Sequence, residues 1–267
     1  YRGLEAFGTG DAADYFGREH LVAELVACVA TWPFVAVIGP SGSGKSSLAR
    51  AGLVPAIADG VLAGSEGWSV TIVAPGAHPL AALAEAEAAS AAGSTRVLII
   101  DPLEELWTVC ADPTERATFV ERVLAWADAP DGVVVVCLRS DFVGRVAEQP
   151  RLAAAVGAGT LLVSEMTDDE LRRAIEGPAR RRGLGVEPAL VDAASRDVAG
   201  RPGALPLLST ALLATWERRS GGLLTVRDYR AAVGRETRAW AREADEGGDV
   251  PVEEVADLRT DAGRDGS

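Results

Sequence analysis

The chain has 267 residues, of which 48% are hydrophobic and 24% are charged. This length and balance predict a globular protein with one large domain, or with one large and one smaller domain. The formal charge of −13 disfavours nucleic acids and anionic membrane surfaces as partners, because their phosphate groups repel an acidic protein.

Two further signals narrow the class of protein. The three cysteines, Cys28, Cys110 and Cys137, have no CxxC spacing, which argues against a disulfide framework or a zinc site. No basic segment precedes an apolar one as in a signal peptide, and no apolar stretch is long enough to span a bilayer. We therefore expect a cytoplasmic protein. Since the chain begins at Tyr1 without a methionine, we also expect a module of a larger protein.

From residue 11 to residue 163 the predicted elements alternate between helix and strand. Apolar residues at helical spacing predict a helix within 11–32. Asp112, Pro113 and Glu115 have the order of an N-cap, a first-turn proline and a third-position glutamate, so a helix is expected to begin there. Buried strands are expected at 34–38, 97–100 and 133–138, a strand with partial alternation at 68–74, a short fifth strand at 160–163, and other helices at 46–57 and 79–92. This order predicts an α/β fold, in which helices sandwich a parallel sheet.

After about residue 165 the strands disappear from the pattern. Thr167-Asp168-Asp169-Glu170 is a capping box, and the helix that it opens is expected to end near Gly183. Further helices are expected at 188–198, 205–218 and 224–233, the last of them capped by Thr225. Residues 243–267 are rich in Asp, Glu and Gly, which is typical of a mobile tail.

The only lysine of the chain lies in a glycine-rich segment between the first predicted strand and the next helix. This segment, Gly39-Pro40-Ser41-Gly42-Ser43-Gly44-Lys45-Ser46, has the pattern of a phosphate-binding P-loop, or Walker A motif. The amide groups of residues 42–44 are expected to surround a β-phosphate. Lys45 would bridge the β- and γ-phosphates, and the Ser46 hydroxyl would coordinate Mg²⁺. The alternative is an ordinary turn rich in glycine and serine.

Three carboxylates follow the third predicted strand, in the Walker B region of such a protein. Asp101 ends the strand, where a magnesium-associated carboxylate belongs. Glu104 and Glu105 come next, and a carboxylate there could orient and deprotonate a water molecule that attacks the γ-phosphate. Two adjacent side chains cannot easily both face the nucleotide. We expect Glu105 to be the base and Glu104 its orienting or magnesium-shell partner; the alternative is a charged first helical turn.

Arg139 directly follows the fourth predicted strand. The carboxyl ends of strands line the ligand crevice of an open α/β sheet, so Arg139 could sense or neutralise the γ-phosphate. The competing interpretation is an ion pair with Asp141 or with a nearby glutamate.

Several segments together carry a resemblance to a known family. They are Tyr15-Phe16-Gly17-Arg18-Glu19, the P-loop with Arg50-Ala51-Gly52-Leu53, Ile100-Asp101-Pro102-Leu103-Glu104-Glu105-Leu106, Leu138-Arg139-Ser140-Asp141-Phe142, and Gly203-Ala204-Leu205-Pro206. The chain resembles a STAND NTPase (signal transduction ATPases with numerous domains), of the first novel STAND subtype of bacterial multidomain proteins. It departs from the family at Pro102-Leu103, where glutamine and phenylalanine are more usual.

The resemblance implies a nucleotide site and a strand order. Gly17 and Arg18 would border adenine and ribose, and Pro206 would cap the adenine, although Pro206 by itself is simply a first-turn helix proline. The full set of expected nucleotide-binding residues is Gly17, Arg18, Gly39, Pro40, Ser41, Gly42, Ser43, Gly44, Lys45, Ser46, Ser47 and Pro206. The Walker B strand would be separated from the P-loop strand by the sensor strand. A winged-helix continuation is not recognisable after Val233.

The predicted organisation has three parts. Residues 1–165 form a P-loop NTPase core with an N-terminal segment beside the adenine, 166–220 a helical lid, and 221–267 a connector and acidic tail. The resemblance further implies a switch in which ATP holds a closed, often self-associating state and hydrolysis resets it. Neighbouring sensor and effector domains would supply its input and output.

The first functional hypothesis is a slow, Mg²⁺-dependent ATPase that works as a signalling switch, with ATP or ADP as its ligand. Its catalytic residues would be Lys45, Glu104, Glu105 and Arg139, and its metal-associated residues Ser46 and Asp101. The alternative, motivated by Pro102, is a nucleotide-binding scaffold without turnover. A third interpretation, a small-molecule or nucleotide kinase, lacks a distinct acceptor site.

Overall fold

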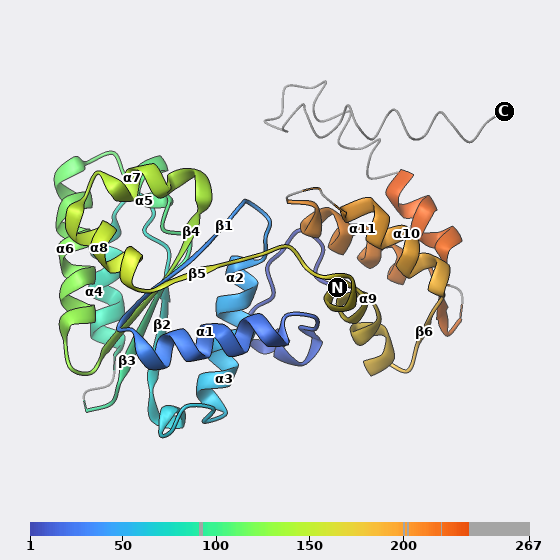
Figure 1. Ribbon diagram of the computed structural model, residues 1–267, viewed down its shortest axis with the longest axis horizontal. Helices are drawn as coiled ribbons and strands as arrows, with labels where there is room; N and C mark the ends of the chain where they lie inside the picture. The colour runs from blue at the N-terminus through green and yellow to red at the C-terminus, as the bar shows by residue number, and fades with distance from the viewer. Residues whose placement is uncertain (91–92, 200, 202, 220, 235–267) are drawn as a thin grey trace.

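The computed structural model describes residues 1–90, 93–199, 201, 203–219 and 221–234. Figure 1 shows a sheet between two layers of helices, and a group of helices that follows the last strand of this sheet. The tail expected at 243–267 and any winged helix after Val233 lie outside the described residues.

Five parallel strands form the sheet, in the order β2-β3-β4-β1-β5. They are β1 (Phe34–Gly39), β2 (Ser69–Val73), β3 (Arg96–Ile100), β4 (Gly132–Arg139) and β5 (Thr160–Leu162). β4 therefore lies between β1, which leads into the glycine-rich loop, and β3, which ends just before Asp101. The predicted α/β fold is confirmed, and so is the order of these three strands.

Alternate residues of each strand face opposite layers of helices. In β1, Phe34, Ala36 and Ile38 pack on one side, while Val35 and Val37 pack on the other, and β3 and β4 alternate in the same way. The first side is covered by α4 (Pro79–Ala89), α6 (Pro113–Asp128) and α8 (Pro150–Ala158), and the second by α1 (Glu19–Thr31), α2 (Lys45–Ser47) and α3 (Val54–Ala58). Because both faces are covered, β1, β3 and β4 are almost entirely buried and apolar, as the continuous runs of the sequence indicate, whereas the outer strands β2 and β5 are partly exposed.

The helix after the glycine-rich loop widens in its middle. α2 continues through a π-helical stretch, Leu48–Leu53, into α3, so the helix expected at 46–57 is present with a local change of pitch. π-helical turns inside α-helices are frequent at functional sites. Short helices also follow the ends of β3 and β4, namely α5 (Glu105–Thr108) and α7 (Val143–Ala147).

The helical part contains the three helices that the sequence predicts between residues 166 and 219. They are α9 (Asp168–Arg181), α10 (Pro188–Val198) and α11 (Ala204–Arg218). The capping box of α9 is present: the Thr167 hydroxyl accepts from the amide of Glu170, and the Glu170 carboxylate accepts from the amide of Thr167. Apolar residues of all three helices form a separate core.

The expectation that strands are absent after residue 165 is wrong. β6 (Gly185–Val186) and β7 (Leu223–Leu224) pair in parallel and close one end of the helical part. Strands of two residues show no alternation, so no sequence period indicates them. The last expected helix consequently begins at residue 226, after β7, and Thr225 accepts from the amide of Asp228 as its cap.

The helix expected within 11–32 is divided in two. A 3₁₀ turn, η1 (Thr9–Asp14), comes first, and α1 begins only after Gly17, whose φ of +87° cannot continue a helix. A Cβ at Gly17 would lie 2.3 Å from the carbonyl oxygen of Glu170 in α9. Glycine at this position therefore lets α9 approach the segment that precedes α1.

Candidate functional site

The glycine-rich loop connects β1 to α2 at the carboxyl end of the sheet. Gly42 and Gly44 have φ values of +69° and +94°, which a side chain would disfavour. A Cβ at Gly42 would also lie 3.0 Å from the carbonyl oxygen of Gly203 and 3.1 Å from Cδ of Pro206. The N-terminus of α11 thus packs directly on the loop, which needs glycine at its apex.

Lys45 is buried against its own loop. Its Nζ donates to the carbonyl oxygens of Gly39, at 3.0 Å, and Pro40, at 2.8 Å. Burial lowers the pKa of Lys45, and the nearby Glu104 carboxylate opposes this shift. The ammonium group therefore lies in the loop where a phosphate could replace its two carbonyl partners.

Asp101 lies beside Ser46, as a metal-associated carboxylate should. The Ser46 hydroxyl donates to Oδ1 of Asp101 at 2.7 Å, and the Asp101 side chain is 1% exposed. Arg50 also binds this carboxylate, with Nε 2.9 Å and one terminal nitrogen 2.8 Å from Oδ2. Both oxygens of Asp101 already accept hydrogen bonds from the helix that follows the loop.

Glu104 and Glu105 lie in the reverse of the expected arrangement. Glu104 is nearly buried, accepts from the amide of Arg139 at 3.2 Å and is close enough to Lys45 to affect its pKa. Glu105, the expected base, points away toward the end of β2, where it accepts from the amide of Gly76 at 3.1 Å. Glu104 thus faces the end of β4, next to the strand that leads into the loop, and Glu105 faces the end of β2.

Arg139 makes the ion pair that the sequence offers as the alternative to a phosphate contact. Its Nε and one terminal nitrogen lie 3.1 Å and 2.7 Å from the Asp141 carboxylate, and its guanidinium lies over the ring of Phe142. The side chain is 41% exposed. Only the backbone amide of Arg139 reaches Glu104 in this arrangement.

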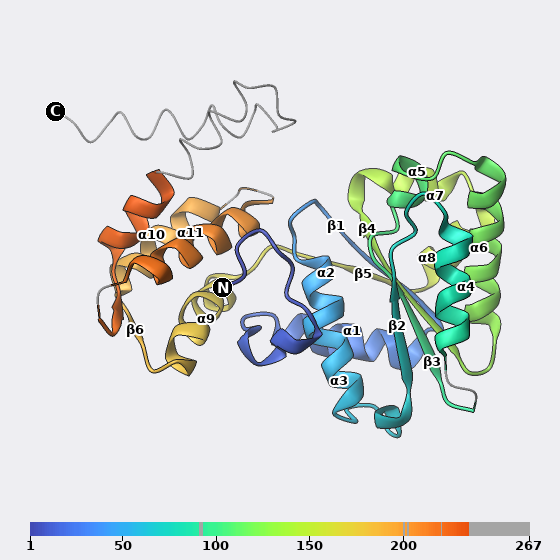
Figure 2. The same ribbon diagram turned by 180° about the vertical axis from the view of Figure 1, so that it is seen from behind.

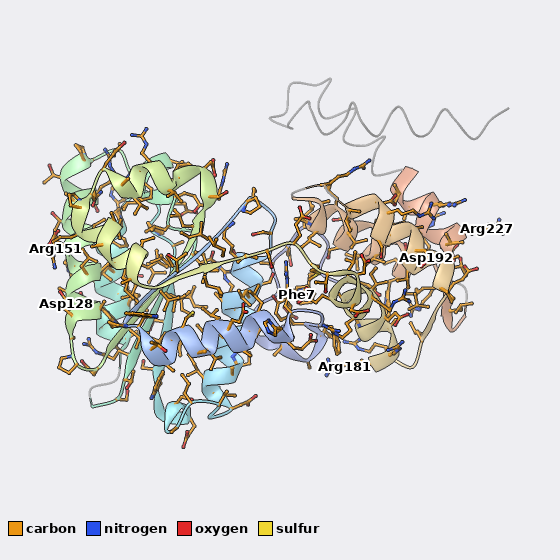
Figure 3. All side chains as sticks on the ribbon, in the orientation of Figure 1. Phe7, Asp128, Arg151, Arg181, Asp192 and Arg227 are labelled. Carbon is orange, nitrogen blue, oxygen red and sulfur yellow. The ribbon has the colours of Figure 1, made fainter. Side chains whose placement is uncertain are left out.

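A cavity of about 240 Å³ opens beside the loop, between the N-terminal segment and helices α9 and α11. Most of its wall is apolar or aromatic, including Phe7, Tyr15, Leu205 and Leu212. Figure 2 shows the N-terminal segment running between α2 and the helical part, and in Figure 3 Phe7 lies at this boundary. Such a wall suits a flat nucleobase, with the loop at the other end for phosphates.

The expected nucleotide-binding residues fall into two groups around this cavity. Those that line it are Arg18, Gly42, Ser43, Gly44, Lys45, Ser46, Ser47 and Pro206. Gly17, Gly39 and Ser41 do not line it, and Pro40 borders a smaller neighbouring cavity of about 90 Å³. Arg18 is buried, with one terminal nitrogen 3.4 Å from the carbonyl oxygen of Ser43, and burial lowers its pKa.

Two buried hydroxyl groups in the cavity wall have no hydrogen-bond partner. Among the described residues, the only buried side-chain oxygen or nitrogen atoms without a partner are Oγ of Ser43, in the loop, and Oγ of Ser209, in α11. Buried polar groups in native proteins normally have partners. A ligand with phosphates at one end and a hydrogen-bonding base at the other would supply both.

Ser209 and Arg50 lie at the site but are not among the residues predicted for it. Ser209 shows no sequence signal, because it is one hydroxyl in an apolar helix. Arg50 has one: it lies four residues after Ser46, so the two share a helix face. That spacing could have indicated that Arg50 also faces Asp101.

The residues present fit a nucleotide with Mg²⁺. The unpartnered Ser43 hydroxyl, the loop amides and Lys45 suit phosphates, while the Ser46 hydroxyl and Asp101 suit a metal shared with phosphate oxygens. The described residues contain no group of three His, Cys, Asp or Glu side chains that could hold a metal without such help. No helix among these residues is both long and apolar enough to span a bilayer.

Comparison with known proteins gives one family. The model of Novel STAND NTPase 1 matches residues 1–247 of the chain. No curated protein matches it significantly.

Solved structures show the same fold at low sequence identity. The chain is similar to the ORC1 protein of Aeropyrum pernix, solved in complex with DNA, with a TM-score of 0.62 and 19% identity over 89% of this chain and 69% of that one. It is similar to Hsp104 of S. cerevisiae, solved with casein, with a TM-score of 0.61 and 16% identity over 82% of this chain and 42% of that one. It is also similar to domain III of the replication initiation protein DnaA of Thermotoga maritima, with a TM-score of 0.59 and 12% identity over 87% of this chain and 94% of that one.

Proposed function

The chain belongs to the Novel STAND NTPase 1 family, and on that premise we propose that it is an ATP-binding, slowly hydrolysing signalling switch. One observation carries the proposal. The loop that holds the only lysine opens into a cavity whose opposite wall is formed by the helical part, so a bound nucleotide would touch both parts. Binding that depends on contacts to both parts favours the closed arrangement.

Each site residue has a task in this proposal. Amides of residues 42–44 and the Lys45 ammonium would hold the phosphates, while Arg18 and Pro206 would border the sugar and base. Mg²⁺ would bind near the Ser46 hydroxyl and the Asp101 carboxylate, and its charge would offset the negative charge of the phosphates. Arg139 would have to leave Asp141 to reach a γ-phosphate.

We assign the general base to Glu104, because its carboxylate faces the end of β4, which pairs with the strand that leads into the loop, and influences the pKa of Lys45. The Arg139 amide occupies Oε2 of this carboxylate, so the attacking water has to use the other oxygen or replace this contact. This restraint favours slow hydrolysis. A long-lived ATP state is what a switch requires, since the closed state then persists between turnovers.

Phosphate release from ATP tests this assignment. We expect slow release by the unaltered protein, at least a hundredfold slower release with Glu104→Gln, and a smaller effect of the adjacent Glu105→Gln. Loss with Glu105→Gln but not with Glu104→Gln would contradict our choice of base. Tight nucleotide binding without any release of phosphate would favour the alternative, a scaffold without turnover. The hydrogen bonds that Glu104 and Glu105 accept from backbone amides also support this alternative.

Membership of the family supports a proposal about the wider setting of the domain. We propose that residues 1–165 bind the nucleotide, 166–220 close over it, and 221–267 connect the switch to other domains in a cytoplasmic, multidomain protein. The ATP state would self-associate or contact sensor and effector domains. Mass measurement by light scattering with ATP and with ADP tests this, since equal masses in both states would exclude nucleotide-dependent self-association.

A further inference from the structure

Asp101 has a resident counter-ion on the helix that follows the loop. Arg50 contacts Oδ2 of Asp101 with both Nε and a terminal nitrogen, at 2.9 Å and 2.8 Å, while Ser46 occupies Oδ1 at 2.7 Å. Arg50 lies in the π-helical stretch, one helical turn beyond Ser46. The two residues that donate hydrogen bonds to this carboxylate thus lie on one helix face.

The partners differ in burial. The Asp101 side chain is 1% exposed, and an ionised carboxylate so far from water needs a nearby positive charge. Arg50 is 36% exposed, so its own charge remains partly hydrated and its guanidinium has room to move. Among the described ion pairs, Arg50 has no second carboxylate partner.

A divalent cation near Ser46 would be attracted by the same Asp101 carboxylate that binds Arg50. Bringing a dication close to Arg50 adds a repulsion that the Asp101 carboxylate alone would not present. Direct ligation through Oδ2 would also require the guanidinium to give up its hydrogen bonds. The cation and Arg50 therefore compete for Asp101.

We propose that Arg50 is a positioning residue that holds Asp101 and weakens the retention of Mg²⁺ at the nucleotide site. The inference rests on the proposed function, because it concerns the metal that accompanies the nucleotide. It predicts that the cation leaves the site more readily than the Ser46–Asp101 pair alone would allow.

The test is a Mg²⁺ titration of the protein in complex with a fluorescent ADP analogue, with protein in excess so that all the analogue is bound. The free Mg²⁺ concentration at half of the fluorescence change reports the affinity of the complex for the cation. We expect Arg50→Met, which keeps much of the aliphatic stem, to lower this midpoint about tenfold. Arg50→Lys keeps the charge with fewer donors, so its midpoint should fall less.

Arg96→Met is the matched control. Arg96 also binds a carboxylate with two nitrogens, at 2.8 Å and 3.1 Å from Asp131, but at the opposite end of the sheet. Its midpoint should equal that of the unaltered protein. In EDTA, Arg50→Met should unfold at a lower temperature than the unaltered protein, because Asp101 loses its counter-ion. The difference between the two unfolding temperatures should become smaller when Mg²⁺ and ADP are added.

The outcomes separate the two proposals. A midpoint that is unchanged or raised in Arg50→Met, with or without lower stability, would overturn the role of Arg50 and reduce it to a structural ion pair. Failure of the unaltered protein to bind the analogue, with and without Mg²⁺, would overturn the proposed function and this inference with it.

Discussion

At the residue scale, side chains of the candidate site already have partners in the backbone of the protein. Lys45 donates hydrogen bonds to two loop carbonyls, and Glu104 accepts one from the amide of Arg139. The sequence predicts that Lys45, Ser46 and Asp101 lie near one another, because their spacing is tied to strand and helix ends, and Ser46 does contact Asp101. It does not predict the directions of Glu104 and Glu105, because these depend on a backbone contact that spacing does not reveal.

That contact is the hydrogen bond from the amide of Leu103 to the carbonyl of Cys137, at 2.8 Å. It extends the pairing of this segment with β4 beyond the end of β3, and so brings Glu104 beside Arg139. Leu103 and Leu106 both pack in the core, which fixes the rotation of α5 and turns Glu105 toward Gly76.

The Ser209 hydroxyl gives a prediction at this scale. We expect Ser209→Ala to weaken ATP binding about fivefold, since one neutral hydrogen bond contributes about 1 kcal/mol. Without nucleotide, the variant should unfold at the same or a higher temperature, because a buried hydroxyl without a partner is removed.

Thr210→Ala provides the comparison for this variant in calorimetric titrations with ATP. Its hydroxyl already has a partner, the carbonyl of Pro206 at 3.0 Å, and it does not line the cavity. Equal ATP affinities of Ser209→Ala and the unaltered protein would show that the base does not reach this hydroxyl.

At the scale of elements, ion pairs join η1 and the first residue of α1 to α9 and its C-cap. Asp14 binds Arg181 at 2.8 Å and Arg182 at 3.0 Å, and Glu19 binds Arg173 at 3.3 Å. Helices such as α9 can be predicted from their caps and periodicity. Their docking partners cannot, because the ion pairs join residues more than 150 positions apart.

Asp14 therefore gives a prediction about closure. Burial raises its pKa, but hydrogen bonds and charges from Arg181 and Arg182 outweigh this and lower it. A carboxyl group with a lowered pKa in the folded state stabilises above its ordinary value of 3.8, and this contribution is lost as the pH falls through the lowered value. We expect Asp14→Asn at neutral pH to loosen α9 as acid does in the unaltered protein.

Hydrogen exchange of the α9 amides can measure this loosening. The expected change is small, at most a few-fold in rate, because the pairs are partly exposed. Asp128→Asn, which removes an exposed partner of Arg151 on the far side of the sheet in Figure 3, should leave α9 unchanged. Identical α9 exchange in Asp14→Asn and the unaltered protein would exclude this role of the ion pairs.

At the scale of the whole molecule, the sheet is the part that the sequence predicts best. Continuous apolar runs mark β1, β3 and β4, which are buried on both faces. The loop and Asp101 follow β1 and β3, and Arg139 ends β4, all at the carboxyl end of the sheet. The cavity is harder to predict, since Phe7, Lys45 and Leu205 meet only through the docking of the N-terminal segment and α11 on the loop.

The most direct test of nucleotide binding at this loop is a calorimetric titration of ATP, with Mg²⁺, into the unaltered protein and into Lys45→Met. We expect binding by the unaltered protein and an affinity at least tenfold lower in the variant, because a charge-assisted contact to phosphate is lost. Circular dichroism should show that both proteins are folded. Equal affinities, or no binding by the folded, unaltered protein, would contradict the account.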